Sequence, residues 1–257
     1  MVNIEGLKKG FDGFVALNGL NLQISKGSIY GLVGVNGSGK TTVIKHLAGV
    51  YTPDEGSVTI NGKPVMDNAA CKASIGYVSD EMYFFQSYHI KSLRKFYKNM
   101  YRTWDDLRFD ALIQLMGLDT SRRVGRFSKG MQKQTALALA LSIKPDFLLL
   151  DEPIDGLDPI VRKNIFDWII GDVAERTMTV LISSHNLKEM DGICDTVGII
   201  KNGKMLLQSD LDELKTDMAN NPAFTHLPPS LDEIFIYAYR QDGNTNDNHQ
   251  KGGAIHE

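Results

Sequence analysis

The chain has 257 residues, of which 42% are hydrophobic and 23% charged, and its formal net charge at pH 7 is −3. This length suits one large α/β domain or two small ones, and the composition is ordinary for a globular protein. The charge gives no support for a nucleic-acid surface, and no apolar stretch approaches the ~20 residues that a membrane span needs.

The N-terminus lacks the apolar core of a signal peptide, because residues 1–10 carry Glu5, Lys8 and Lys9. The two cysteines, Cys71 and Cys194, stand far apart and in no metal-binding pattern. We therefore expect a cytosolic protein whose cysteines are reduced and buried.

Apolar residues alternate weakly in residues 1–27, which predicts short antiparallel strands. Phe11 and Phe14 lie in the Gly-rich connection between these strands. An aromatic residue there usually packs in the core or a hairpin. The alternative is a ring that stacks on an adenine, and the local pattern leaves both open.

A glycine-rich loop follows the apolar run 29–33 and precedes the helix-compatible stretch 43–47. Its glycines let consecutive backbone N–H groups point into one concavity, where the following helix adds the positive end of its dipole. Lys40 supplies a charge for the outer phosphates of a nucleotide, and the Thr41 hydroxyl can bind Mg²⁺. A turn that binds nothing needs only one or two glycines, whereas this loop has the full spacing of a phosphate-binding motif. The predicted phosphate-binding residues are Gly34, Asn36, Gly37, Ser38, Gly39, Lys40, Thr41 and Thr42.

Two Asn-Gly pairs predict two-residue β-hairpins later in the chain. Asn61-Gly62 separates residues 57–60 from 63–66, and Asn202-Gly203 separates 197–201 from 204–207. A short strand is expected at 75–78, and it breaks at 79–81.

Aromatic residues cluster in 82–126, where the apolar spacing predicts helices. Thr103 and Asp106 resemble a capping pair that opens one of these helices, which should end near Gly117. The charge-poor stretch 83–85 is either an exposed edge that binds a partner or plain core.

Two buried strands are expected near acidic and polar residues. The apolar run 147–150 ends at Asp151 and Glu152, and residues 179–184 end at His185. Because side chains alternate along a strand, Asp151 can serve a metal while Glu152 serves an attacking water. Adjacent acids on a surface turn are the alternative, which the preceding apolar run disfavours.

Taken with residues 127–132 and 183–185, these motifs resemble an ABC-type ATPase, the nucleotide-binding subunit of a transporter. The resemblance covers roughly residues 1–215 and implies an α/β fold, a P-loop NTPase with a RecA-like core. An antiparallel β subdomain and a helical subdomain at about 82–143 would accompany that core. Residues 216–240 would form a C-terminal extension, and we expect a disordered tail at 241–257.

The resemblance also implies roles for single residues. Gly34 to Thr42 would be the Walker A loop, Asp151 the Walker B aspartate, Glu152 the catalytic glutamate and His185 the switch histidine. Phe11 would stack on adenine, and Asp158, which together with Pro159 also opens a predicted helix, would communicate across a dimer. Ser128 and Gly130 would bind the γ-phosphate of ATP held by the opposite subunit of a head-to-tail dimer.

Three positions depart from the family pattern. Lys129 interrupts the signature sequence, which is usually Leu-Ser-Gly-Gly-Gln. Asp80 stands where glutamine is expected, so it can ligate Mg²⁺ or orient water but adds negative charge beside ATP. Ile154 and Asp155 replace small hydroxyl residues in the loop before Asp158.

The sequence thus predicts an ATP-hydrolysing subunit that powers a separate membrane permease through ATP-driven dimer closure. It would use ATP and Mg²⁺, pair with a second ATPase subunit in a homo- or heterodimer, and lie on the inner face of the cell membrane. Residues 229–235 resemble the ending of exporter-type subunits of bacterial multidrug and antibiotic-resistance systems. One alternative is a soluble ABC ATPase acting on ribosomes or DNA, which the single Walker A loop and the net charge disfavour; we expect no nucleic-acid partner. Another is a regulatory ATP-binding module with weak turnover, which Glu152 and His185 disfavour.

Overall fold

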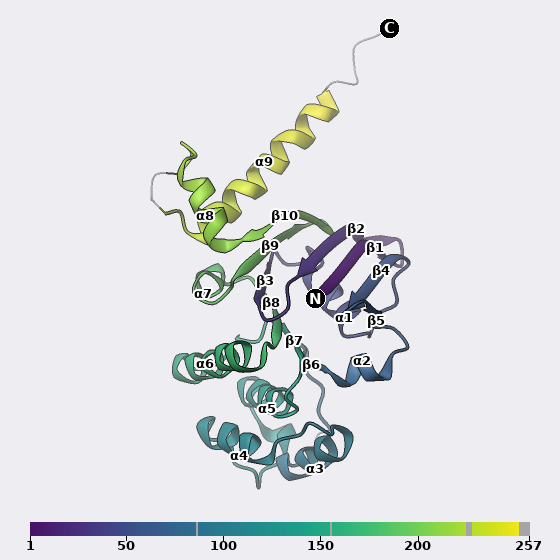
Figure 1. Cartoon of the computed structure of the whole chain (residues 1–257), viewed down its shortest axis with the longest axis vertical. Helices are drawn as coiled ribbons and strands as arrows, with labels where there is room; N and C mark the ends of the chain where they lie inside the picture. The colour runs from purple at the N-terminus through teal and green to yellow at the C-terminus, as the bar shows by residue number, and fades with distance from the viewer. Residues whose placement is uncertain (86, 155, 225–227, 252–257) are drawn as a thin grey trace.

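A computed structural model describes residues 1–85, 87–154, 156–224 and 228–251, with side chains described up to residue 241 (Figure 1). Its strands form two sheets. The first is antiparallel, in the order β2-β1-β4-β5. Its members are β1 (Val2–Phe11), β2 (Phe14–Ile24), β4 (Glu55–Ile60) and β5 (Lys63–Pro64).

The second sheet has the order β10-β9-β3-β8-β7-β6 and is parallel from β9 to β6, with β10 antiparallel at its edge. Its members are β3 (Ile29–Val33), β6 (Ile75–Val78), β7 (Phe147–Asp151), β8 (Thr179–Ser184), β9 (Thr196–Lys201) and β10 (Lys204–Asp210). Every residue of β3, β7 and β8 is buried, as expected for parallel strands covered on both faces.

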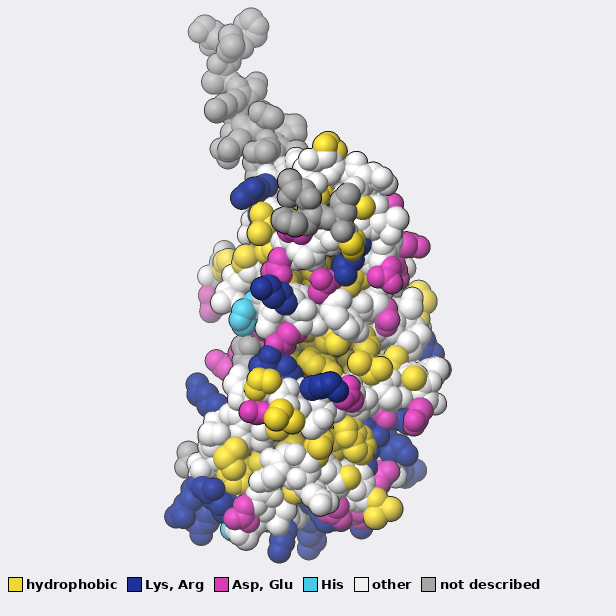
Figure 2. Space-filling view, turned by 90° about the vertical axis from the view of Figure 1, so that its left-hand side faces the viewer, with side chains coloured by type: hydrophobic (Ala, Val, Ile, Leu, Met, Phe, Trp, Pro, Cys, Tyr) yellow, Lys and Arg dark blue, Asp and Glu magenta, His cyan; other side chains and the backbone are white. Residues whose placement is uncertain are grey.

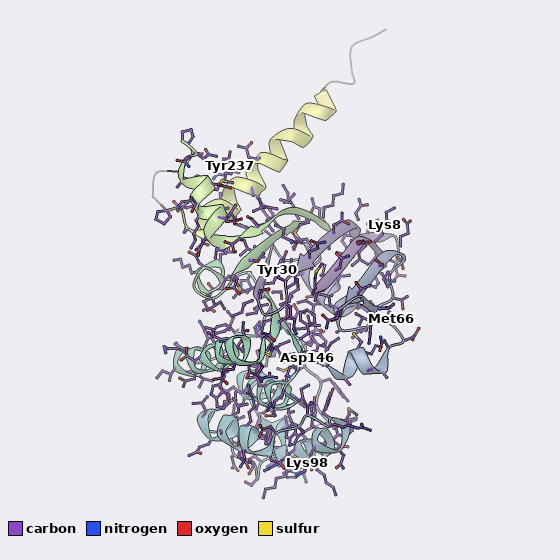
Figure 3. The ribbon with its side chains drawn as sticks, viewed as in Figure 1. Lys8, Tyr30, Met66, Lys98, Asp146 and Tyr237 are labelled. Atoms are coloured by element: carbon purple, nitrogen blue, oxygen red, sulfur yellow. The ribbon has the colours of Figure 1, made fainter. Side chains whose placement is uncertain are left out.

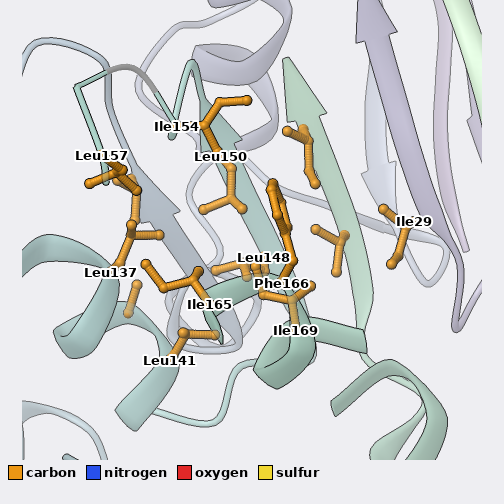
Figure 4. Close-up of a cluster of buried hydrophobic side chains, with 14 of the residues drawn as sticks. Ile29, Leu137, Leu141, Leu148, Leu150, Ile154, Leu157, Ile165, Phe166 and Ile169 are labelled. Atoms are coloured by element: carbon orange, nitrogen blue, oxygen red, sulfur yellow. The ribbon is translucent and has the colours of Figure 1, made fainter. Parts of the chain in front are cut away.

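One hydrophobic core lies between the two sheets and includes the helix α1 (Lys40–Leu47). The other lies under α5 (Lys129–Ser142) and α6 (Pro159–Arg176), which both pack on the face of β7 (Figure 4). There Leu137 and Leu141 of α5 and Ile165 and Ile169 of α6 surround Leu148. The functional loops at the ends of β3, β7 and β8 therefore rest on a packed sheet.

Helices α3 (Ile90–Met100) and α4 (Asp106–Leu115) form a layer beyond α5 (Figure 1). The short helices are α2 (Ala69–Ala73), which lies below β5 in Figure 1, and η1 (Val124–Arg126). Arg108 of α4 donates to the carboxylate of Asp172 in α6, with 2.8 Å from Nη1 to Oδ1, which ties this layer to α6. On the face of the molecule that includes α6, acidic and basic side chains are interspersed over the middle and upper part. Lys and Arg side chains predominate at the lower end of this face (Figure 2).

The chain ends in α7 (Leu187–Asp191), α8 (Leu211–Ala219) and α9 (Leu231–Lys251). Tyr237 of α9 lies beside α8, where its hydroxyl accepts from the Asn221 amide at 3.1 Å (Figure 3). Helix α8 crosses the expected boundary at residue 215. Helix α9 reaches into the expected tail 241–257, whose disorder stays a prediction, as do the domain boundaries.

Local signals predicted several elements correctly. Both Asn-Gly hairpins form with positive φ at both turn residues, and the strands at 75–78 and 179–184 have the predicted bounds. The predicted capping pair is wrong, because Asp105 caps α4 through a bond from Arg108 N–H while the Thr103 hydroxyl donates to the carbonyl of Ile143. Both cysteines are buried and free, as expected. Among the described helices, none combines the length and hydropathy that crossing a membrane requires.

Candidate nucleotide-binding site

The glycine-rich loop joins β3 to the N-terminus of α1, as predicted. Gly39 has φ 113° and precedes the first helical residue. A Cβ atom there would lie 2.9 Å from the Leu17 side chain, and one at Gly34 would lie 2.5 Å from the carbonyl of Ile200. Larger residues would therefore displace the loop from the strand behind it.

A cavity of about 460 Å³ lies over this loop. It brings together residues from four separate segments of the chain. They are Phe11, Phe14, Ala16, Asn36, Gly37, Gly39, Lys40, Thr41, Thr42, Asp80 and Glu152. Ser38 lies behind the loop, buried, and its carbonyl accepts from Gly203 N–H at 2.9 Å. Most of the predicted phosphate-binding residues thus face one volume.

Phe11 sits at the end of β1 on the rim of this cavity and is 37% exposed. Its ring centroid lies 5.2 Å from that of Tyr51, and Lys9 Nζ lies 5.5 Å from the ring. This exposure disfavours the core interpretation, and the ring is available to stack on a planar ligand.

Lys40 is buried in the loop beneath the cavity. Its Nζ donates to the carbonyls of Gly34 at 2.8 Å and Val35 at 3.3 Å, and lies 3.6 Å from Oε1 of Glu152. These carbonyls hold the ammonium group at the loop that lines the cavity, where a phosphate-binding cation is expected.

Two of the residues predicted to hold Mg²⁺, Thr41 and Asp151, are in contact. Oδ1 of Asp151 accepts from the hydroxyls of Thr41 at 3.1 Å and Ser183 at 2.7 Å. Oδ2 of Asp151 is buried and has no hydrogen-bond partner within the described residues. A buried carboxylate oxygen without a partner is costly, and a cation would satisfy it. The described residues contain no larger cluster of metal ligands, and Mg²⁺ held by one carboxylate, one hydroxyl and substrate phosphates needs none.

Glu152 and His185 meet at the carboxyl ends of β7 and β8. Oε2 of Glu152 lies 2.9 Å from Nδ1 of His185 and also accepts from the His185 backbone N–H at 3.3 Å. Glu152 has φ 47°, an uncommon value for a residue with a side chain, and its N–H donates to Ser183 at 3.2 Å. The pair can orient a water molecule and accept its proton.

The signature residues lie elsewhere. Ser128 caps α5, its hydroxyl accepting from Met131 N–H at 3.2 Å, and a Cβ atom at Gly130 would lie 2.5 Å from the carbonyl of Gly156. Asp158 caps α6 through a bond of 2.9 Å from Ile160 N–H. Among the residues described, these three are not part of the lining of the nucleotide cavity. Their contact with ATP on a second subunit stays a prediction.

Asp80 lines the nucleotide cavity, and its Oδ1 lies 3.4 Å from Nζ of Lys133. Sequence reasoning missed Lys133, although a signal existed. Lys133 shares a helix face with the buried Leu137 and Leu141, at spacings of four residues, and this spacing could have indicated that Lys133 is buried. A metal role for Asp80 stays a prediction. Asp155 lies outside the described residues, and Ile154 is buried.

Tyr239 was also missed, because it comes from the C-terminal helix α9. Its hydroxyl accepts from the Val35 N–H of the loop at 3.2 Å and donates to the Ile200 carbonyl at 2.6 Å. This bridge ties α9 to the first turn of the phosphate-binding loop.

Comparison with known proteins supports a nucleotide site. The model of the ABC transporter family matches residues 17–155. The chain is 31% identical over 217 residues to the ABC transporter ATP-binding protein YtrB of Bacillus subtilis (strain 168), covering 84% of this chain and 74% of YtrB. It is also 29% identical over 254 residues to the linearmycin resistance ATP-binding protein LnrL of the same organism. That match covers 96% of this chain and 81% of LnrL.

The fold agrees with that assignment. The solved "Structure of ATP binding subunit of ABC transporter" superposes with a TM-score of 0.83 at 22% identity, covering 93% of this chain and 99% of that chain. At this identity the likeness shows the fold, which is that of a P-loop NTPase. Because the family model spans more than half of the residues and contains the cavity-lining loop, the chain belongs to the ABC transporter family, as an ATP-binding subunit.

Proposed function

We propose that this chain hydrolyses ATP to drive a separate membrane permease. One observation carries the proposal. Lys40 and Glu152 line the cavity, and with His185 they form a continuous chain of polar contacts, with 3.6 Å from Lys40 to Glu152 and 2.9 Å from Glu152 to His185. A phosphate-binding cation therefore adjoins a proton acceptor, the arrangement that attack of water on a terminal phosphate requires.

The residues would divide the reaction as follows. The loop N–H groups and Lys40 bind and orient the phosphates of ATP. Glu152 orients the attacking water and accepts its proton, and His185 holds the Glu152 carboxylate in place. Mg²⁺, held by Thr41 and Asp151, would neutralise phosphate charge when bound. Phe11 would stack on the adenine.

We further propose that two chains close over each ATP, head to tail. Support comes from the position of Ser128 and Gly130, which are away from the cavity of their own chain although the signature motif around them is largely retained. Each complete site would then consist of the loop of one chain and the α5 N-terminus of another, as C₂ symmetry permits.

A mixing experiment tests hydrolysis and the shared site together. Lys40→Ala disables the phosphate loop and Ser128→Arg blocks the signature, so each variant alone should lose at least about 100-fold in phosphate release. In a heterodimer of the two, one site keeps both an intact loop and an intact signature. A 1:1 mixture should therefore recover roughly one quarter of the wild-type rate. A mixture no more active than the sum of its parts would contradict the shared site.

The permease would dock on an exposed aromatic edge formed by Tyr83, Phe85 and Tyr88. Tyr83 is 85% exposed and Phe85 58%, their ring centroids are 5.9 Å apart, and Phe85 also contacts Tyr88 at 5.0 Å. Half-buried Phe84 packs against the core and anchors this edge. Exposed aromatic clusters of this kind mark protein contacts. The likeness to LnrL and the segment 229–235 support an exporter-type permease, with the chain on the inner face of the cell membrane.

Fractionation tests the docking edge. Tagged wild-type chain, expressed in its own cells, should sediment with membranes and co-purify with a multi-span protein. The Tyr83→Ala/Phe85→Ala double variant should shift to the soluble fraction while its basal ATP hydrolysis stays unchanged. Leu107→Ala, which removes an 84% exposed apolar side chain of α4, is the matched control and should stay with the membranes. Co-purification of the wild type with ribosomes instead would overturn the permease assignment.

A further inference from the structure

The signature helix α5 carries a lysine that touches two functional segments at once. Lys133 is only 5% exposed. Its Nζ donates to the backbone carbonyl of Glu152 at 2.5 Å and lies 3.4 Å from Oδ1 of Asp80. A buried ammonium group is tolerated only when it is paired and hydrogen-bonded, so these two contacts account for its place in the helix.

The bond to Glu152 acts on an unusual backbone. Glu152 has φ 47°, which is costly for a residue with a side chain and persists only where its surroundings hold it. Ser183 accepts from its N–H, His185 contacts its carboxylate, and Lys133 donates to its carbonyl. Lys133 is therefore the contribution of α5 to the orientation of Glu152.

The contact with Asp80 concerns charge. Asp80 lines both the nucleotide cavity and a neighbouring cavity of about 580 Å³, which Lys133 and Lys129 also line. Because Asp80 lines the nucleotide cavity, its carboxylate would repel the phosphates of ATP unless a cation compensates it. Lys133 supplies that cation from the buried side.

We propose that Lys133 is a positioning residue that links α5 to Glu152 and also neutralises the charge of Asp80. The Asp80–Lys133 ion pair would then take the place of the neutral glutamine that the family pattern has at position 80. The proposal rests on the proposed function, in which Glu152 serves the attacking water. It also gives α5, whose N-terminus would meet the ATP of the other chain, a direct contact with the hydrolytic glutamate.

Two effects of Lys133 can be separated by measuring binding and turnover. Lys133→Gln should lower kcat about 10- to 100-fold, because Glu152 loses its carbonyl donor and shifts. It should also weaken the Kd for ATP about 3- to 10-fold, because the Asp80 carboxylate is left uncompensated beside the phosphates. In Lys133→Gln/Asp80→Asn the Kd should return to the wild-type value while kcat stays low. If Lys133 had a purely structural role, the second substitution would not restore the Kd for ATP while kcat stayed low.

Controls distinguish the possible failures. Lys163→Gln breaks an exposed Lys–Asp pair on α6, with 3.0 Å from Lys163 Nζ to Asp167 Oδ2, and should leave both constants unchanged. If Glu152→Gln still hydrolyses ATP, the proposed function fails. If Glu152→Gln is inactive but Lys133→Gln folds and keeps wild-type kcat and Kd, only the present inference fails.

Asp80→Asn keeps the inference testable if Lys133→Gln does not fold, as judged by thermal unfolding. The side chain of Asp80 is half exposed, so this variant should fold. Its Kd for Mg²⁺-ATP should be unchanged or tighter, because a negative charge leaves the cavity rim. A Kd weakened about 10-fold or more would overturn the proposal, because Asp80 would then be binding the metal or nucleotide directly.

Discussion

The carboxylate of Glu152 lies 2.9 Å from Nδ1 of His185, across the ends of the neighbouring parallel strands β7 and β8. Because the strands are buried along their whole length, the pair is held on a rigid base. More than half of the His185 side chain is nevertheless exposed.

We predict that His185→Ala lowers kcat about 100-fold, because the Glu152 carboxylate loses the group that orients it. The Kd for ATP should change little, since the described cavity lining does not include His185. Steady-state phosphate release together with calorimetric ATP binding measures both values. Equal kcat for the variant and the wild type would rule out an orienting role.

The Thr41–Asp151 contact predicts how binding depends on the metal. Asp151→Asn removes the charge that would hold Mg²⁺ but keeps the volume of the side chain. The variant should bind ATP with nearly the same Kd in Mg²⁺ as in EDTA, whereas the wild type should bind more tightly in Mg²⁺. Calorimetry under the two conditions makes the comparison. A variant that still binds more tightly in Mg²⁺, by the wild-type factor, would show that Asp151 does not hold the metal.

The helical layer depends on a buried charge cluster. Asp172 is 4% exposed and accepts from Arg108 Nη1 at 2.8 Å and Arg176 Nε at 3.1 Å. Asp172→Ala should lower the free energy of unfolding by about 3–5 kcal/mol, because two partly buried guanidinium groups lose their partner. Asp167→Ala, on the same helix, breaks the exposed ion pair with Lys163. It should change the free energy of unfolding by less than about 1 kcal/mol. Urea unfolding measures both, and similar losses in the two variants would contradict the cluster.

His46 predicts a pH dependence of stability. Burial lowers the pKa of this histidine below its usual value, and its Nδ1 lies 2.7 Å from the carbonyl of Thr42. The unfolded chain therefore binds a proton near pH ~6.5 that the folded chain does not bind until lower pH. Stability should be full above pH ~6.5 and fall as the pH drops through that value toward the folded pKa. Urea unfolding between pH 7.5 and 5.5 should show a smaller decline for His46→Gln, and an equal decline would exclude His46 as its source.

Much of the site was predictable because its signals are local. The loop around Lys40, the Asn-Gly turns and the acids after the apolar run each depend on neighbours in the sequence. Lys133 and Tyr239 were not predicted, because their partners are distant. Tyr239 contacts Val35 across 204 positions, and no local pattern relates them. The predicted cap of α4 was wrong for another reason. The Thr103 hydroxyl donates to the carbonyl of Ile143, which is distant in the sequence, and Asp105 caps the helix instead.

We propose that Glu152 carries ATP hydrolysis at the cavity over the glycine-rich loop. The most direct measurement is phosphate release by Glu152→Gln at saturating Mg²⁺-ATP, with bound nucleotide quantified in the same sample. We predict that the variant binds ATP as the wild type does, while phosphate release falls by about 10²- to 10⁴-fold. Equal phosphate release from the variant and the wild type would contradict it.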